Sequence, residues 1–138
     1  MMQLKWKTAL PVLMMTLVFA APAAMADTID DQLAAYQAEG GSDFSAERGK
    51  DLWFRNSPDS ASGKPRSCAS CHTNNARVNG KHAKTGKPIK PMARSVNPER
   101  FTDAKKIEKW FKRNCKWTYD RECTPQEKGD FLSYLRQL

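Results

Sequence analysis

Several kinds of signal are scarce or missing in this chain of 138 residues. It contains two histidines and four cysteines, and no segment alternates apolar and polar residues as a half-buried strand does. There is no internal repeat. No segment after the N-terminal one approaches the ~20 apolar residues that a membrane-spanning helix needs. These absences argue against sheet and repeat architectures and predict one small all-α domain.

The N-terminal segment, 1–26, has the three parts of a secretory signal peptide: a short basic start, an apolar stretch, and Ala24-Met25-Ala26 as an A-x-A cleavage site. A membrane anchor is the alternative, but the apolar stretch contains Pro11 and is shorter than a bilayer span. We therefore expect the mature chain, 27–138, to be a single domain exported to the bacterial periplasm, without stable membrane insertion.

One histidine completes a motif, Cys68-Ala69-Ser70-Cys71-His72, which is the CxxCH signature for covalent attachment of a c-type haem. Two residues between the cysteines let one helical turn present both thiols to the vinyl groups of a porphyrin. The next residue then directs an imidazole at the iron. Cys68 and Cys71 are thus predicted to form thioether bonds, and His72 to be the proximal ligand. A single motif predicts one haem c per chain.

Zinc sites and thioredoxin-like redox sites also use CxxC pairs. A zinc site needs a second close pair, whereas Cys115 and Cys123 lie far downstream and apart from each other. A redox pair needs a strand before it, whereas 57–67 is rich in Pro, Ser, Gly and Lys. Haem attachment is therefore the favoured interpretation.

The formal net charge of +8 is unevenly distributed. Acidic residues are concentrated near the start of 27–138, and a segment directly after the haem motif carries only basic ones. These are Arg77, Lys81, Lys84, Lys87, Lys90 and Arg94. In an exported protein this charge does not indicate nucleic-acid binding. It indicates either docking of acidic redox partners or solubility alone.

The period of the apolar residues predicts four helices around this motif. They are expected at 30–39, at 46–55 after the N-cap Ser45, from Thr102 onward, and from Thr124 to the C-terminus. Gly49 with Trp53, and Tyr134 with Leu135, look like the helix crossing of a class I cytochrome c. The fold class is therefore predicted to be the small class I cytochrome c fold, with one covalently attached haem.

On the residues alone, the second iron ligand is open. Asn114 continues the apolar face of the third helix, either as a ligand or as a polar residue near the helix end. Met92, the one methionine of 27–138, lies where a class I cytochrome c supplies its thioether, or packs on the porphyrin. His82 is predicted to be solvent-exposed in the Gly- and Lys-rich loop.

Several segments, namely 97–103, 107–110, 113–115 and 121–128, resemble the sphaeroides haem protein family of oxygen-binding class I cytochromes c. The similarity extends over essentially all of 27–138. The resemblance implies that Asn114 is the distal ligand of ferric iron and leaves on reduction. It also implies a Cys115–Cys123 disulfide. Met92, which its position in the chain suggests, is the alternative distal ligand.

The resemblance implies a periplasmic electron-transfer cytochrome that binds O2 or NO when reduced. A hard amide oxygen suits Fe(III), whereas a soft thioether suits Fe(II), so a plain His/Met electron carrier is the alternative function. A haem enzyme that reduces O2, NO or peroxide ranks lower, because no distal histidine is evident. A dihaem cytochrome c and a membrane b-type cytochrome are the partners that the family suggests.

Overall fold

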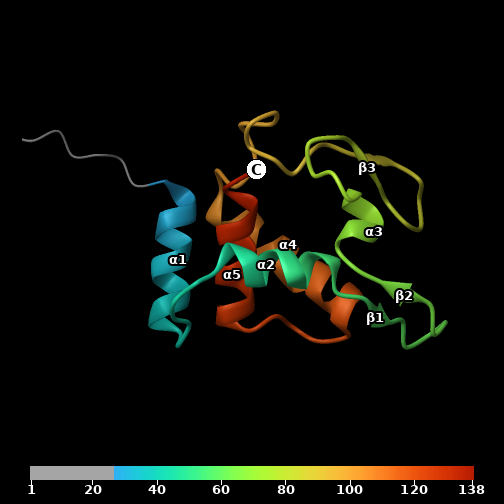
Figure 1. The fold of residues 1–138 in the computed structure, drawn as a ribbon, viewed down its shortest axis with the longest axis horizontal. Coiled ribbons are helices and arrows are strands. Elements are labelled where there is room, and N and C mark those ends of the chain that lie inside the picture. Colours follow the sequence, from blue (N-terminus) through green and yellow to red (C-terminus); the bar gives the residue numbers. More distant parts are fainter. Residues whose placement is uncertain (1–26) are drawn as a thin grey trace, which may run out of the picture.

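A computed structural model describes residues 27–138, so the expected signal peptide lies outside the described residues. Residues 27–138 form five helices and four very short strands (Figure 1). In order they are α1 (Thr28–Ala38), α2 (Ala46–Phe54), β1 (Ser57–Pro58), β2 (Pro65–Arg66), α3 (Ala69–His72), β3 (Gly80–Lys81), β4 (Pro88–Ile89), α4 (Ala104–Tyr119) and α5 (Pro125–Leu135). Within this part of the chain, no helix is long and apolar enough to cross a membrane.

The starts of α2 and α5 follow the capping residues of the sequence, whereas those of α1 and α4 differ from the prediction. α1 begins at Thr28, two residues before the predicted start, because the Asp27 carboxylate caps it. The Ser45 hydroxyl accepts from the Arg48 amide at the start of α2, and Thr124 forms a complete capping box with Glu127 at the start of α5. The prediction of Thr102 as the cap of α4 is wrong by one residue. Asp103 caps α4 through its carboxylate, because the Thr102 hydroxyl donates instead to the carbonyl of Glu99.

Two small antiparallel ladders were not predicted. β1 pairs with β2 and β3 pairs with β4, each over two residues per strand, which is too short to leave an alternating pattern in the sequence. The second ladder lies against α3 at Gly80. A Cβ atom at Gly80 would lie 2.1 Å from the carbonyl oxygen of Cys71, so glycine permits this close approach.

The predicted crossing of α2 and α5 is confirmed at Gly49. A Cβ atom there would lie 2.0 Å from the carbonyl oxygen of Asp130 and 2.8 Å from the Cβ of Tyr134. The Trp53 and Tyr134 rings pack beside this contact with centroids 6.1 Å apart. The absent side chain therefore allows the two backbones to touch.

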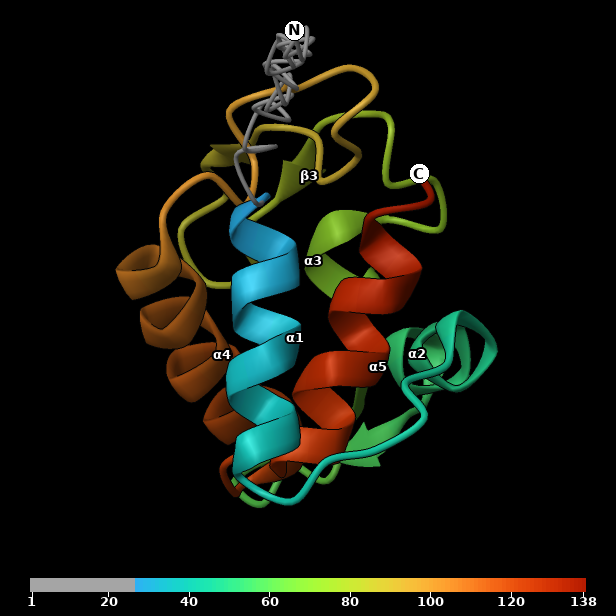
Figure 2. The same cartoon turned by 90° about the vertical axis from the view of Figure 1, so that its left-hand side faces the viewer.

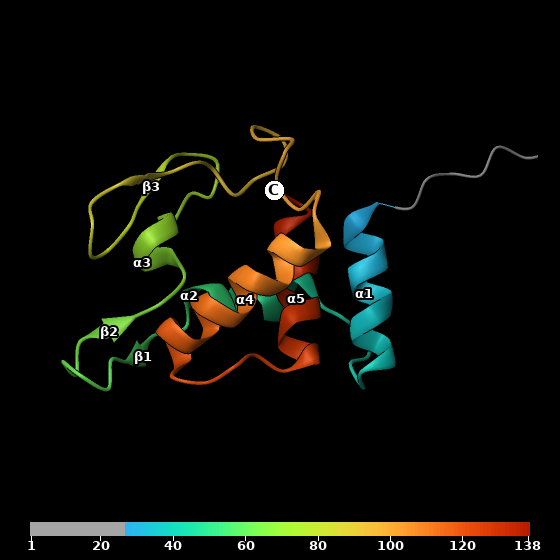
Figure 3. The same cartoon turned by 180° about the vertical axis from the view of Figure 1, so that it is seen from behind.

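The core has two parts, one on each side of α5. The first joins α2, the ends of α4 and α5, and both bridged cysteines, and the second joins α1 to α4 and α5. Figure 2 shows α1 between α4 on one side and α5 on the other. α3 and the strands lie at the end of the molecule opposite α1 (Figure 3). The haem motif is thus held mainly by loops, against a helical scaffold.

Candidate haem site

A cavity of about 590 Å³ brings together the residues that the sequence singled out. α3 contributes the CxxCH side chains, α4 contributes one face, and the segment after β4 contributes another wall. Predicted site residues in its lining are Cys68, Cys71, His72, Met92 and Asn114. The wall is largely apolar, with contributions from Trp53, Phe101, Phe111, Phe131 and Leu135. A cavity of this size and character suits a cofactor.

His72 lies in this cavity in its neutral form. Burial lowers the pKa of its imidazole to about 4, and the positive charge of Arg100 acts in the same direction. Its Nδ1 atom is buried without a hydrogen-bond partner, and its ring lies 5.3 Å, centroid to centroid, from that of Trp53. A neutral imidazole is the form that coordinates a metal ion.

The two cysteines of the motif are free thiols. Burial raises the pKa of the Cys68 thiol to about 11, whereas reactive redox cysteines have lowered values. Cys115 and Cys123 are joined to each other in a disulfide and are therefore unable to complete a zinc site with the motif. Neither alternative to haem attachment has support in this geometry.

The face of α4 that carries Asn114 is turned to the cavity. Ile107 is buried and Phe111 is half-buried, but Asn114 is exposed and Trp110 is 48% exposed, although all of them line the cavity. The sequence predicted a stripe packed in the core. Instead, only Ile107 and Phe111 reach the core. Trp110 lies at the cavity mouth, where the Cζ atom of Arg113 is 5.2 Å from the centroid of the Trp110 ring.

Met92 approaches the same cavity from the segment after β4. Its amide donates to the carbonyl of Ala76 at 2.8 Å, and its side chain packs half-buried against the core cluster that contains Trp53. His82 is exposed, as predicted, but it also lies at the cavity rim. Its Nδ1 atom accepts from the Thr85 amide at 3.2 Å, so this nitrogen is used within the β3–β4 turn.

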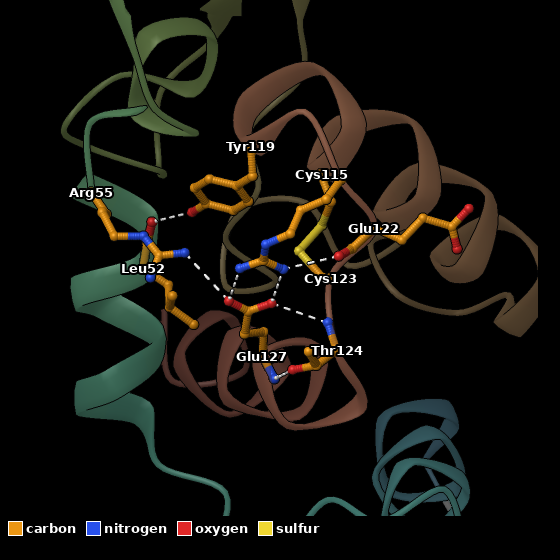
Figure 4. A network of polar contacts seen from close by, with 9 residues as sticks. Leu52, Arg55, Cys115, Tyr119, Glu122, Cys123, Thr124 and Glu127 are labelled. Atoms are coloured by element: carbon orange, nitrogen blue, oxygen red, sulfur yellow. Dashed lines mark hydrogen bonds and ion pairs between the residues drawn. A yellow bond between two sulfur atoms is a disulfide. The ribbon is translucent and has the colours of Figure 1, made fainter. Parts of the chain in front are cut away.

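The disulfide Cys115–Cys123 is present, as the resemblance implied, and ties α4 to the segment before α5. Polar contacts surround it (Figure 4). Arg121 forms two hydrogen bonds of 2.7 Å with Glu127, and Arg55, directly after α2, lies 3.3 Å from the same carboxylate. The Tyr119 hydroxyl donates to the carbonyl of Leu52 at 2.6 Å. The end of α4 next to Asn114 is thereby fixed to both α2 and α5.

Sequence reasoning assigned no role to several residues that the cavity contains. Arg100 and Phe101 line it from the loop before α4, and Trp117 and Tyr119 line it from the end of that helix. Arg100 and Phe101 lie within the segment 97–103 that carried part of the family resemblance. No periodicity marks a loop residue, which is why only the tertiary structure reveals these two.

Comparisons with known proteins agree on one family. A family model described as a domain of unknown function, DUF1924, matches residues 39–135. The cytochrome c-type protein SHP of Cereibacter sphaeroides is 42% identical over 126 residues, which cover 89% of this chain and 95% of the relative. Cytochrome c'' of Methylophilus methylotrophus is 44% identical over 84 residues, or 61% of this chain and 58% of the relative.

Solved structures of both relatives share the fold. Oxidised SHP, described as an oxygen-binding cytochrome c, superposes with a TM-score of 0.70 at 38% identity and covers 82% of this chain and 100% of its own. Oxidised cytochrome c'' from Methylophilus methylotrophus gives a TM-score of 0.71 at 36% identity, with 79% and 93% covered.

The helical fold, with a CxxCH motif opening into an apolar cavity, defines a small c-type cytochrome. Within that class the chain belongs to the family of SHP, and its residues 39–135 form a DUF1924 domain. The predicted family and fold class are confirmed.

Proposed function

We propose that this chain is a periplasmic cytochrome with one haem c, active in electron transfer, whose reduced form binds O2 or NO in place of Asn114. The observation that carries the proposal is that His72 and Asn114 line one cavity from α3 and α4. When bound, haem supplies a one-electron couple and, in the ferrous state, a coordination position for a diatomic gas.

The residues present fit the cofactor. Cys68 and Cys71 are unpaired thiols on one helical turn, and His72 is neutral with a nitrogen that has no protein partner. Thioether bonds from the cysteines would fix the porphyrin, and His72 would hold the proximal side. Apolar side chains around the cavity would exclude water from the ring.

Asn114 is proposed as the distal ligand of ferric iron. An amide oxygen is a hard donor, so its hold weakens when the iron becomes ferrous. The disulfide at the adjacent Cys115 keeps the end of α4 in place, so the released amide stays near the cavity and can donate a hydrogen bond to a gas molecule there. Two descriptions of relatives support this: oxygen binding for SHP, and haem-ligand detachment for cytochrome c''.

Electrons are proposed to arrive from acidic redox proteins. The loop from 77 to 94 borders the cavity through Ala83, Lys84 and Ile89. The dihaem cytochrome c and membrane b-type cytochrome associated with the family are the proposed donors. Export by the segment 1–26, which lies outside the described residues, would place the chain with such partners in the periplasm.

The test compares optical spectra of the wild-type holoprotein with those of Asn114→Ala and Met92→Leu. The haem of the wild type should resist acid-acetone extraction, because thioether bonds survive it. Asn114→Ala should open the ferric haem to water or added anions, preserve CO binding to the ferrous haem, and shorten the lifetime of the oxygenated form. Met92→Leu should change little.

The second candidate, a plain His/Met electron carrier, has one observation in its favour, since Met92 also lines the cavity. It predicts the opposite pattern: wild-type ferrous protein indifferent to CO, a ferric spectrum altered by Met92→Leu, and no effect of Asn114→Ala. That outcome would overturn the ligand exchange. Complete extraction of the haem from wild-type protein would overturn the covalent cofactor itself.

A further inference from the structure

Arg100, in the loop between β4 and α4, lines the cavity with a half-buried side chain. Backbone carbonyls hold its guanidinium in place. Nε donates to the carbonyl of Pro91 at 2.8 Å, and one Nη donates to the carbonyl of Lys90 at 2.6 Å. Both contacts are to neutral oxygens, and across 27–138 no carboxylate forms an ion pair with this arginine. Its charge therefore has no protein counterpart in the described part of the chain.

The other basic residues of the cavity wall differ from Arg100. Lys84, Lys106 and Arg113 are exposed to solvent. Lys106 also pairs with Asp103 at 3.5 Å, and Arg113 lies over the ring of Trp110. Solvent and these contacts balance the charges of all three, whereas Arg100 has lost part of its hydration without gaining an anion.

The acidic residues of the wall do not supply that anion. Glu99 is exposed, and Asp103 is occupied by the Lys106 amide at 3.1 Å and by the Lys106 ammonium. Burial lowers the pKa of Arg100, which is the physical sign of a cation that is poorly solvated. A partly desolvated cation without a counter-ion is unfavourable, so the site favours an anion in the cavity.

The loop is also arranged in advance. Phe101, the next residue, has φ of +61°, a left-handed conformation that is unfavourable for a bulky side chain. Phe101 packs against both core clusters, which holds the loop in this form. Asn97 donates to the same Pro91 carbonyl as Arg100, at 3.0 Å. The position of the guanidinium is thus set by the fold and needs no ligand to create it.

We propose that Arg100 binds a carboxylate of the cofactor, namely a haem propionate, and thereby raises the reduction potential. The inference rests on the proposed haem function. A guanidinium matches a carboxylate in shape and forms strong charge-assisted hydrogen bonds. A free propionate carries a negative charge that stabilises ferric iron. Pairing with the Arg100 guanidinium offsets this charge, so the pair favours the ferrous state, in which the gas is bound.

The experiment uses holoproteins of wild type, Arg100→Gln, Arg100→Lys and the control Arg113→Gln. Resonance Raman spectroscopy reports the propionate bending modes, which rise in frequency when the carboxylate is hydrogen-bonded, and a redox titration reports the midpoint potential. Arg100→Gln should lower the bending frequency and reduce the ferrous-to-ferric ratio at a fixed ambient potential about tenfold, which is ~59 mV for one electron.

Arg100→Lys keeps the charge but loses the forked geometry, so its Raman modes should shift while the potential stays close to that of wild type. Arg113→Gln removes an exposed charge of the same wall and should leave the Raman modes unchanged. Unchanged Raman modes in both Arg100 variants would overturn the proposal, even if the potential falls. If Arg100→Gln yields no holoprotein, the Raman modes of Arg100→Lys decide. Failure of the haem proposal itself is recognised separately, because the wild-type protein would then lose its haem on acid-acetone extraction.

Discussion

Glu127 is the residue on which the polar contacts around the disulfide converge. It accepts from Arg121, from Arg55 and from the Thr124 amide, and its own amide donates to the Thr124 hydroxyl. Hydrogen bonds from Arg121 lower its pKa to about 2, against an opposing effect of burial. The helix cap of α5 and the end of α4 therefore share one carboxylate (Figure 4).

Glu127→Gln should destabilise the holoprotein at neutral pH by about 1 kcal/mol, because the charge-assisted bonds with Arg121 are lost. The folded-state pKa is below its usual value of 4.5, so the contribution is complete above that pH and is lost as the pH falls through about 2. The difference in unfolding free energy between wild type and variant, measured by denaturant titration, should shrink between these values.

The control for this prediction is Glu122→Gln. The Glu122 side chain is 55% exposed and faces the Lys116 ammonium at 3.3 Å, so its loss should change stability by less than Glu127→Gln. A gap between Glu127→Gln and wild type that stays constant down to pH 2 would contradict the assignment.

At the scale of elements, the contact of α2 with α5 supports the haem motif. α2 carries Trp53, whose ring lies beside His72, and α5 carries Phe131 and Leu135 into the cavity wall. The two helices meet where Gly49 faces the backbone of α5. A change at this contact is transmitted to the proximal side of the site, because Trp53 lies one helical turn after Gly49.

Gly49→Ala should separate α2 from α5, since the added carbon would lie 2.0 Å from a backbone oxygen that has no freedom to rotate away. We expect a loss of about 1–3 kcal/mol, as for other overpacked contacts, and a lower thermal midpoint of the holoprotein. Lys50→Ala, at the neighbouring exposed position of α2, is the control and should leave the midpoint nearly unchanged. Equal midpoints for both variants would show that the crossing is not tight.

At the scale of the whole molecule, positive charge is matched at one end and unmatched at the other. Near α1, Arg136 pairs with Asp30, and Arg94 pairs with Asp27. In the loop of β3 and β4, the side chains of Lys81, Lys84, Lys87 and Lys90 are exposed, and none forms an ion pair within the described residues. The field at this border of the cavity is therefore positive, as docking of acidic partners requires.

The double variant Lys87→Glu, Lys90→Glu should slow reduction by an acidic one-electron carrier protein at low salt, by roughly tenfold, because the two new negative charges cancel those of Lys81 and Lys84 and the attraction is lost. Raising the ionic strength should reduce the difference from wild type. Stopped-flow measurements give both rates. The control is the double variant Lys50→Glu, Lys105→Glu, which lowers the net charge by the same amount but at positions on α2 and α4. It should slow the reaction less. Equal effects of the two variants would leave solubility as the function of the loop lysines.

The sequence by itself determined the features that depend on local spacing. The CxxCH motif consists of neighbouring residues, and the start of α5 follows from Thr124 and Pro125. Gly49 could be identified because a close helix crossing needs a residue without a side chain. The family resemblance supplied the pairing of Cys115 with Cys123, which the fold contains.

Only the tertiary structure decided what depends on contacts between distant segments. Asn114 and Met92 come to one cavity from separate elements, and Trp110 turns to its mouth instead of the core. Arg100 gains its importance from burial and from two carbonyls of another part of the loop. Hydration, burial and the absence of a counter-ion are properties of a folded arrangement, and no local pattern of residues encodes them.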